Sequence, residues 1–326
     1  MKSDRLSGLR VVLITQGFSR VFFPLIKSRH KIVGIIEAAP RRKKQTAQGV
    51  IVFLQTVFIQ LKRLFFTEKT LHGYCQNNNI PYFFLEKKTE CNVETWLESV
   101  KPDIIVVYSM SQLLRESIFN WPKYGSINLH TSYLPDYRGP NPDFWYYYFT
   151  DLNPGVTVHY IDNGEDTGDI VCKEKCGIEL GLKSPERLDR LIGEIGVKLL
   201  LESLNNIESG CVRRISQPIQ SPTIRARNLK IEEHKTIIDW DNWPIERVWH
   251  LLRGTELWLN ALPQPKGLWA HQRWTIGEMI KCETNGFNKG KIYKVGSNYF
   301  VCCRDGKIRL HIKFSLKNFV KGIFKL

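Results

Sequence analysis

The sequence predicts an α/β protein in which a Rossmann-like, mostly parallel sheet precedes a smaller, OB-like β-barrel domain. Short apolar runs recur along the amino-terminal part of the chain, and segments of helical period separate them. Strands of this kind are buried on both faces, as in parallel sheets covered by helices. Beyond residue 230 the pattern changes to short strand-like pieces separated by glycines, which is typical of small antiparallel barrels.

The elements of the predicted sheet follow in chain order. Strands are predicted at residues 9–15, 32–37, 104–108, 126–130, 156–161 and 170–176. The shorter helices are predicted at residues 21–27, 93–100 and 112–120. A long helix is predicted from Ser184 to about Asn206, because Ser184-Pro185-Glu186 supplies an N-cap, a proline at the first helical position and an acidic first turn.

The boundary between the two predicted domains lies where the chain loses its periodicity. Residues 211–227 are polar, contain prolines and show no clear period, as a linker does. A short helix at residues 244–252 then precedes the glycine-separated strands. We therefore expect a Rossmann-like catalytic domain in residues 1–208, a linker in residues 209–229 and the OB-like domain in residues 230–326.

Charge and cysteine content limit the functional classes. The chain has 47 Lys and Arg against 32 Asp and Glu, a net charge of +15, which attracts phosphorylated small molecules, nucleic acids or acidic membranes. The cysteines form no CxxC pair, so the sequence predicts neither a metal site nor a disulfide framework. Residues 1–10 lack an apolar core, which predicts no signal peptide and a cytoplasmic location.

One segment does not fit the alternation of strands and helices. Four basic residues at positions 41–44 precede an apolar stretch, residues 50–66, that polar residues interrupt. The uninterrupted apolar part is too short to cross a bilayer. Two interpretations stay open: a long helix packed on the sheet, or a basic helix that makes peripheral contact with the inner face of the membrane through residues 41–66.

Polar residues of chemical interest follow two of the predicted strands. Asn128 and His130 are two residues apart at the carboxyl end of a strand, so their side chains project from the same face. Ligands bind at this edge of parallel sheets. Asp166 lies in the polar, glycine-punctuated loop 162–169 after the next strand, from which a carboxylate can reach the imidazole. The three side chains form a candidate catalytic group.

Two stretches of sequence resemble the folate-dependent formyltransferase superfamily, SINLHTSYLPDYRGPNP and GVTVHYIDNGEDTGDIV. The resemblance extends into the carboxyl domain through residues 238–240, 252–254 and 304–306. It implies that Asn128, His130 and Asp166 are catalytic and that N10-formyltetrahydrofolate is the formyl donor. It also implies that the pterin is held by the backbone around two segments, with the following binding residues: Met110, Gln112, Leu113, Asp162 and Gly164.

The implied catalytic roles agree with the chemistry of the side chains. An amine that attacks a formyl carbon generates an oxyanion and an ammonium. The Asn128 amide and a protonated His130 would stabilise the oxyanion. Asp166 would hold His130 in its charged form and act as general base, directly or through a water. This chemistry requires no metal.

The expected acceptor is the amine of a nucleotide-linked amino sugar used in surface-glycan synthesis. Asp136 stands where the tRNA enzymes of the superfamily usually carry a basic residue. Trp145 and Tyr146 offer flat faces for a sugar or a base, and Arg138 is the nearest candidate for a diphosphate. For the aromatic segment 144–148, the alternative is a helix that packs its rings into the core.

Two other functions stay open at this point. The first alternative is formyl transfer to methionyl-tRNA, which the net charge of +15 and the two-domain resemblance support. The second is a catalytically inactive relative that binds RNA or a membrane. A tRNA substrate predicts a steep dependence on salt, whereas a sugar nucleotide does not. The sequence does not predict the oligomeric state.

Overall fold

The computed structural model of this 326-residue chain describes residues 8–39, 70–86, 90–110, 112–266, 269–270, 272–316 and 319. Residues 41–66, with both interpretations of them, lie outside this part. The chain forms two compact units that interleave along the sequence. Unit 1 comprises Met1–Arg138, Gly155–Glu174 and Leu191–Ile224, and unit 2 comprises Gly139–Pro154, Lys175–Arg190 and Arg225–Leu326. The division into residues 1–208, 209–229 and 230–326 stays a prediction.

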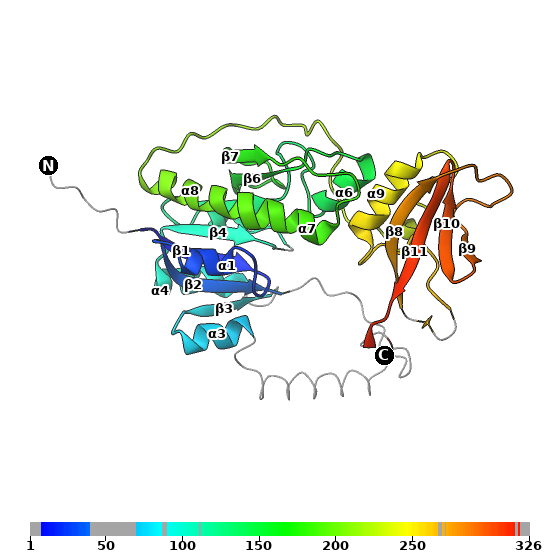
Figure 1. Cartoon of the computed structure of the whole chain (residues 1–326). Helices are drawn as coiled ribbons and strands as arrows, with labels where there is room; N and C mark the ends of the chain where they lie inside the picture. The colour runs from blue at the N-terminus through cyan, green and yellow to red at the C-terminus, as the bar shows by residue number, and fades with distance from the viewer. Residues whose placement is uncertain are drawn as a thin grey trace. The chain divides into compact units, whose positions relative to one another are not determined.

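Unit 1 is built on a seven-stranded sheet with the order β3-β2-β1-β4-β5-β6-β7 (Figure 1). Its strands are β1 (Arg10–Thr15), β2 (Lys31–Ala38), β3 (Tyr82–Leu85), β4 (Ile104–Tyr108), β5 (Ser126–His130), β6 (Gly155–Tyr160) and β7 (Ile170–Lys175). The pairs from β3 to β5 are parallel, and β6 runs antiparallel to β5. The predicted mostly parallel sheet is confirmed.

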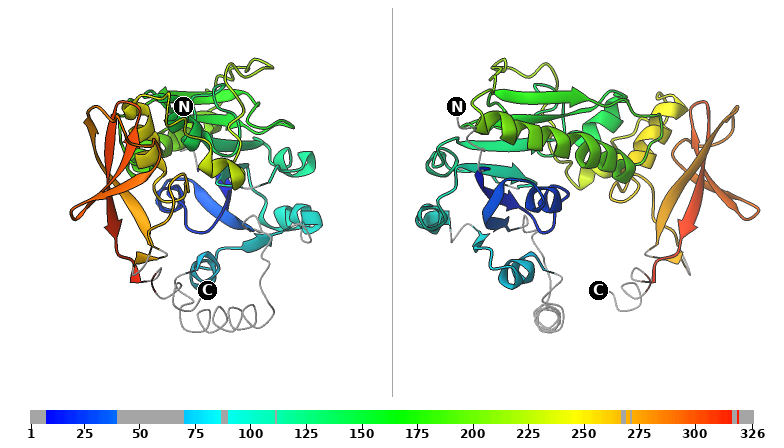
Figure 2. Two further views of the ribbon diagram at one scale, coloured as in Figure 1. Left: turned by 90° about the vertical axis from the view of Figure 1, so that its right-hand side faces the viewer. Right: turned by 60° about the vertical axis from the view of Figure 1, so that its left-hand side comes forward.

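The helices of unit 1 shield this sheet from water. They are α1 (Phe22–Ile26), α3 (Leu71–Asn77), α4 (Val93–Val100), α5 (Glu116–Phe119), a π-helical segment (Asp189–Gly196) and α8 (Val197–Glu208), with a 3-10 turn at Glu90–Asn92. The apolar strand residues and the inner face of α4 form one buried cluster that includes Ile14, Val107 and Leu97. In the right-hand view of Figure 2 the green helix α8 lies in front of the sheet, where it packs on β6.

Two helix predictions differ from the structure in detail. The predicted helix 112–120 is shorter, because Arg115 is extended (φ −69°, ψ 151°) and only α5 is helical. The predicted long helix is confirmed from Ser184 onward, although its middle is π-helical. There Gly196 approaches β5 closely, since a Cβ at this position would lie 3.2 Å from the Leu129 Cδ2 atom. Because glycine has no side chain, the helix can lie this close to β5.

Unit 2 contains a small antiparallel sheet with the order β8-β11-β10-β9. Its elements are α6 (Pro142–Phe149), α7 (Ser184–Leu188), a 3-10 helix (Glu232–Lys235), α9 (Ile245–Thr255), β8 (Arg273–Lys281), β9 (Ile292–Val295), β10 (Asn298–Cys303) and β11 (Gly306–Lys313). The separate antiparallel domain at the carboxyl end is confirmed. The edges of the sheet are β8 and β9, and closure into an OB-like barrel stays a prediction.

The segment between α8 and unit 2 has the irregular backbone that its composition predicts. Residues 211–224 contain one β-bridge, from Ile215 to Ile170 at the start of β7, and otherwise run as coil along this edge strand (Figure 1). They belong to unit 1. No helix in the described part of the chain has the length and apolar character that a membrane span requires.

Candidate active site

The candidate site begins at the carboxyl end of β5. Asn128 and His130 lie on the same face of this strand, with Asn128 partly buried and His130 buried. The antiparallel register with β6 places His159 directly opposite Asn128. The strand pair therefore presents an amide and two imidazoles side by side.

Asp166 reaches this group from the loop between β6 and β7. Within the loop, the Asp162 Oδ1 atom accepts hydrogen bonds from the Gly164 N–H (3.0 Å) and from the Thr167 hydroxyl (2.6 Å). Gly168 passes so close to β6 that a Cβ would lie 2.0 Å from the Tyr160 carbonyl oxygen. Asp166 itself has a φ of 56°, in the left-handed region that non-glycine residues rarely adopt. Contacts around the loop must hold this conformation in place.

The Asp166 carboxylate is the point where the predicted catalytic residues meet. Its Oδ2 atom lies 3.7 Å from the His130 Nδ1 atom, and its Oδ1 atom lies 3.5 Å from the Asn128 Nδ2 atom. The Asp166 side chain is 15% exposed and that of His130 is 9% exposed, so water screens this charge only in part. The structure thus brings the three predicted residues together.

His159 is a fourth member of this cluster that the sequence reasoning missed. Its Nδ1 atom lies 2.8 Å from the Tyr160 carbonyl oxygen, so Nδ1 carries the proton and Nε2 is left as an acceptor. That Nε2 atom is 3.1 Å from the Asn128 Nδ2 atom and 3.5 Å from the Asp166 Oδ1 atom. Both neighbours of the Asn128 nitrogen are therefore acceptors, which fixes the orientation of the amide. A histidine in a mostly apolar strand was the signal in the sequence.

The charge state of His130 depends on opposing influences. Burial lowers its pKa because the charged ring loses hydration, and the nearby His159 acts in the same direction. The Asp166 carboxylate, the Tyr137 carbonyl and Glu165 act in the opposite direction. The net direction of the pKa is downward, so the resting ring is mainly neutral at pH 7. Its Nε2 atom lies 3.4 Å from the Tyr137 oxygen, so both ring nitrogens face oxygen acceptors that would accommodate an added proton.

The residues predicted to hold the pterin lie on two segments next to this cluster. Met110 is partly buried against the core of unit 1, whereas Gln112 and Leu113 are exposed. Asp162 and Gly164 form the turn described above. The Asn163 side chain lies 3.4 Å from the Glu116 carboxylate of α5, which ties the turn to the element that follows residues 112–115. The two segments therefore border the same edge of the sheet.

The residues predicted to bind the acceptor are buried and contact other parts of the protein. Arg138 is 6% exposed, and its guanidinium donates to the carbonyl oxygens of Pro218 (2.8 Å) and Ile219 (3.1 Å) and not to an open site. Trp145 and Tyr146 are 5% and 1% exposed because α6 packs them into unit 2. The alternative of a helix with its rings in the core is the one that the structure shows.

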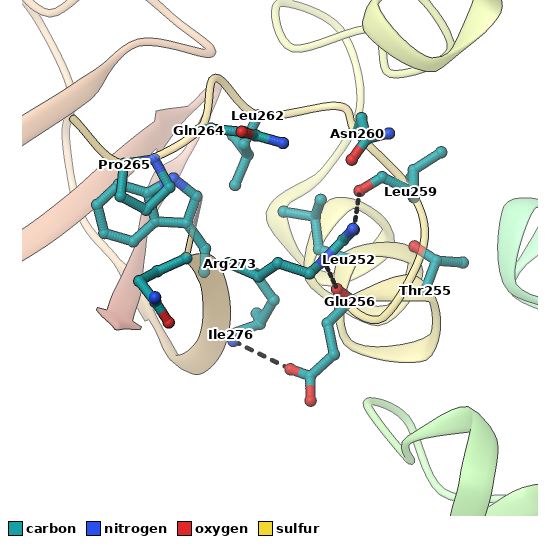
Figure 3. A pocket seen from close by; sticks show the side chains of 12 residues that line it. Leu252, Thr255, Glu256, Leu259, Asn260, Leu262, Gln264, Pro265, Arg273 and Ile276 are labelled. Carbon is teal, nitrogen blue, oxygen red and sulfur yellow. Dashed lines mark hydrogen bonds between the residues drawn. The ribbon is translucent and has the colours of Figure 1, made fainter. Parts of the chain in front are cut away.

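A cavity lies in unit 2, between the end of α9, the loop 257–265 and the start of β8 (Figure 3). The Arg273 guanidinium donates to the carbonyl oxygens of Glu256 and Leu259, each at 3.2 Å, and so closes the last turn of α9. The Glu256 carboxylate accepts from the Ile276 N–H at 3.1 Å. None of the predicted site residues lines this cavity. In the described residues, no cluster of His, Cys, Asp and Glu is suited to hold a metal ion.

Known proteins resemble this chain in sequence and in fold. A protein named methionyl-tRNA formyltransferase from Alkaliphilus oremlandii is 33% identical over 237 residues, which cover 73% of this chain and 69% of that protein. Its namesake from Chlamydia muridarum is 27% identical over 312 residues, covering 94% of this chain and 91% of that protein.

Solved structures agree with the fold. An N-formyltransferase from Helicobacter canadensis, in complex with folinic acid and dTDP-3-aminofucose, superposes with a TM-score of 0.59 at 15% identity, covering 94% of this chain and 100% of that one. HypX from Aquifex aeolicus, in complex with tetrahydrofolic acid, gives a TM-score of 0.55 at 15% identity. The match covers 93% of this chain but only 44% of HypX. At such identities the likeness concerns the fold alone.

A family model described as formyl transferase matches residues 25–204, which is more than half of the chain and includes Asn128, His130 and Asp166. The match agrees with the resemblance of the two motifs and with the parallel sheet that carries them. The chain therefore belongs to the formyl transferase family and is a formyl-transferring enzyme.

Proposed function

We propose that this enzyme transfers a formyl group from N10-formyltetrahydrofolate to a primary amine, with Asn128, His130 and Asp166 as catalytic residues. The observation that carries the proposal is the convergence of an amide and an imidazole on one carboxylate, within 3.5 Å and 3.7 Å. The bound folate supplies an activated formyl carbon. The apolar Met110 and Leu113 and the polar turn at Asp162 and Gly164 suit a flat heterocycle with hydrogen-bonding edges.

In this proposal Asn128 stabilises the negative charge that develops on the formyl oxygen. One amide N–H is held by His159 at 3.1 Å, while the other makes a long contact of 3.5 Å with Asp166. The long contact is the one that a substrate oxygen would replace. Because His159 fixes the amide in advance, little reorganisation is required during the reaction.

His130 and Asp166 accept and transfer the proton that the attacking amine loses. The amine becomes positively charged as it attacks, and this proton has to leave before the carbon–nitrogen bond to the carrier breaks. Asp166 accepts it, directly or through a water, because its carboxylate is partly accessible. His130 is neutral at rest, and the proton that Asp166 takes from the amine passes to the His130 ring, whose Nδ1 atom lies 3.7 Å from the carboxylate. The charged ring then donates to the negative substrate oxygen, and the same proton finally goes to the carrier nitrogen as it leaves.

For the acceptor, we propose the amino group of methionyl-tRNA. The sequence relatives that carry this name support it over the amino sugar. The three side chains that supported a sugar nucleotide, Arg138, Trp145 and Tyr146, are buried. The net charge of +15 suits a polyanionic substrate. A cytoplasmic location follows from this acceptor, and contact with a membrane through residues 41–66 stays a proposal from sequence.

A nucleotide-linked amino sugar is the second candidate, on account of Asp136. This residue is partly exposed on the loop that follows His130, at the motif position that is usually basic in the tRNA enzymes. Its negative charge opposes the approach of an RNA backbone. A small acceptor is less affected because it can place its single diphosphate away from Asp136.

A paired assay tests the proposal. The purified enzyme and the formyl donor are given either methionyl initiator tRNA or a set of nucleotide-linked amino sugars, and formylated product is measured at two salt concentrations. We expect formylation of the tRNA with a rate that falls as salt rises. Formylation of a sugar without any of the tRNA would establish the second candidate. A rate that His130→Ala leaves unchanged would remove the catalytic assignment for either acceptor.

A further inference from the structure

The irregular segment after α8 contacts both loops that carry the candidate catalytic residues. Residues 216–223 are named the strap here. On the side of Asp166, the Gln217 Nε2 atom donates to the carbonyl oxygens of Asp166 (3.1 Å) and Gly168 (2.6 Å). The Ser216 hydroxyl donates to the Asp169 carboxylate at 3.0 Å. The strap thus holds the backbone of the Asp166 loop.

The strap also holds the loop that follows His130. The Gln217 Oε1 atom accepts from the Arg138 Nη2 atom (2.9 Å) and from its Nε atom (3.3 Å). The Tyr137 N–H donates to the Thr223 hydroxyl at 2.6 Å. The Ser221 hydroxyl donates to the Pro135 carbonyl oxygen at 2.8 Å. All of these residues belong to unit 1.

The side-chain amide of Gln217 joins the two loops by itself. Its two N–H groups point at two carbonyl oxygens of one loop, and its oxygen receives two N–H groups of the other. Only an amide combines two donors and a doubly accepting oxygen in this geometry. A glutamate keeps the pairing with Arg138 but turns its second oxygen toward the carbonyls of Asp166 and Gly168, where both partners are acceptors.

These contacts act on the two groups that border His130. Asp166 has the unfavourable φ of 56°, and Gln217 binds its carbonyl oxygen directly. The Tyr137 carbonyl oxygen, which faces His130 Nε2, belongs to a residue whose N–H is held by Thr223. A non-glycine residue in the left-handed region persists only where the surroundings impose it. Without the strap, the carboxylate and the carbonyl that flank the ring are free to shift.

We propose that Gln217 is a positioning residue for formyl transfer, which holds Asp166 and the Tyr137 carbonyl at His130 without touching the substrate. The inference rests on the proposed function and deepens it, since it assigns a positioning role to a segment that its composition marks as a linker. Gln220 provides a matched control. It lies in the same segment and is exposed, and it has no hydrogen bond to any described residue.

The test compares Gln217→Ala, Gln217→Glu and Gln220→Ala in the full chain. For Gln217→Ala we expect kcat to fall by about tenfold to a hundredfold, since a misplacement of about 1 Å at a reacting group can cost about a hundredfold. The KM for each substrate should change less than about twofold, because no substrate contact is lost. Gln217→Glu should be at least as slow as Gln217→Ala, and Gln220→Ala should match the wild type.

The titration of the His130 ring by NMR provides a second measurement that needs no turnover. Four groups influence the pKa of this ring: Asp166, the Tyr137 carbonyl and Glu165 raise it, and His159 lowers it. If the carboxylate and the carbonyl move away in Gln217→Ala, burial and His159 act with less opposition. The pKa of His130 should therefore fall below its wild-type value, while Gln220→Ala leaves it unchanged.

Distinct outcomes separate this inference from the proposed function. If the wild type transfers no formyl group, the proposed function is wrong, and the His130 titration still decides whether the strap positions the cluster. A wild-type kcat and an unchanged His130 pKa in Gln217→Ala would overturn the inference, as would an equal loss in Gln220→Ala. Should Gln217→Ala fail to fold, Thr223→Val removes the hydroxyl that accepts from the Tyr137 N–H and that also contacts the Ser221 hydroxyl and the Ile224 carbonyl oxygen within the segment. A wild-type His130 pKa and kcat in Thr223→Val would refute the strap's role.

Discussion

Replacing Asp166 by asparagine tests the charge at the centre of the candidate site. The change keeps the size of the side chain and removes the negative charge, which lies 3.7 Å from the His130 Nδ1 atom. At about 4 Å and an effective dielectric constant of about 20, two unit charges attract by about 4 kcal/mol. Since about 1.4 kcal/mol corresponds to a tenfold change in rate, loss of this attraction alone lowers the rate by up to about a thousandfold. Because the carboxylate is 15% exposed and partly screened, we expect kcat to fall by about a hundredfold to a thousandfold.

The assay measures single-turnover formyl transfer over a range of pH, together with the affinity for a non-transferable folate. Folate affinity should stay within about threefold, since no folate contact is assigned to this carboxylate. The pKa of His130 should fall, because the Asp166 charge opposes the effect of burial. As a control, Asp151→Asn changes a carboxylate of unit 2 that accepts from the Asn153 N–H and takes no part in the candidate site. A rate for Asp166→Asn equal to that of the wild type would refute the reasoning.

Three further predictions concern histidines. His130→Ala should lower kcat by about a hundredfold or more, as loss of one oxyanion donor does, without a loss of folate affinity in a binding assay. His159→Phe should lower kcat about tenfold because it frees the Asn128 amide, whereas equal rates would exclude a positioning role. Burial lowers the pKa of His250 to about 4. In the unfolded chain His250 therefore binds a proton at a higher pH than in the folded protein. The free energy of unfolding of the wild type should decline by up to about 3 kcal/mol as the pH falls from about 6.5 to about 4. His250→Asn keeps an acceptor for the Gly181 N–H, so this variant should lack the part of the pH-dependent loss that His250 causes. Urea unfolding at several pH values measures the free energy of unfolding of both proteins.

Elements with long, regular apolar patterns could be predicted from the sequence. The strands β4 and β5 and the helix α4 begin and end at the predicted residues. The buried position of each of them is imposed by its own side chains, so local pattern and tertiary environment agree. By contrast, the short β3 and α3 were not predicted, because β3 has only one buried residue and α3 only seven residues, too few to show a clear period.

The candidate catalytic residues could also be found in the sequence, because strand geometry alone sets Asn128 and His130 on one face. The sequence by itself therefore determined the parallel sheet, the edge that carries the candidate catalytic residues, and the family. Only the tertiary structure decided which other side chains serve this edge. His159 joins through the register of β5 and β6, and Gln217 joins through a segment without any period. The buried position of Arg138 likewise argues against its predicted contact with the acceptor. Such contacts join residues far apart in the chain, and a hydrogen bond between distant loops leaves no periodic trace in the sequence.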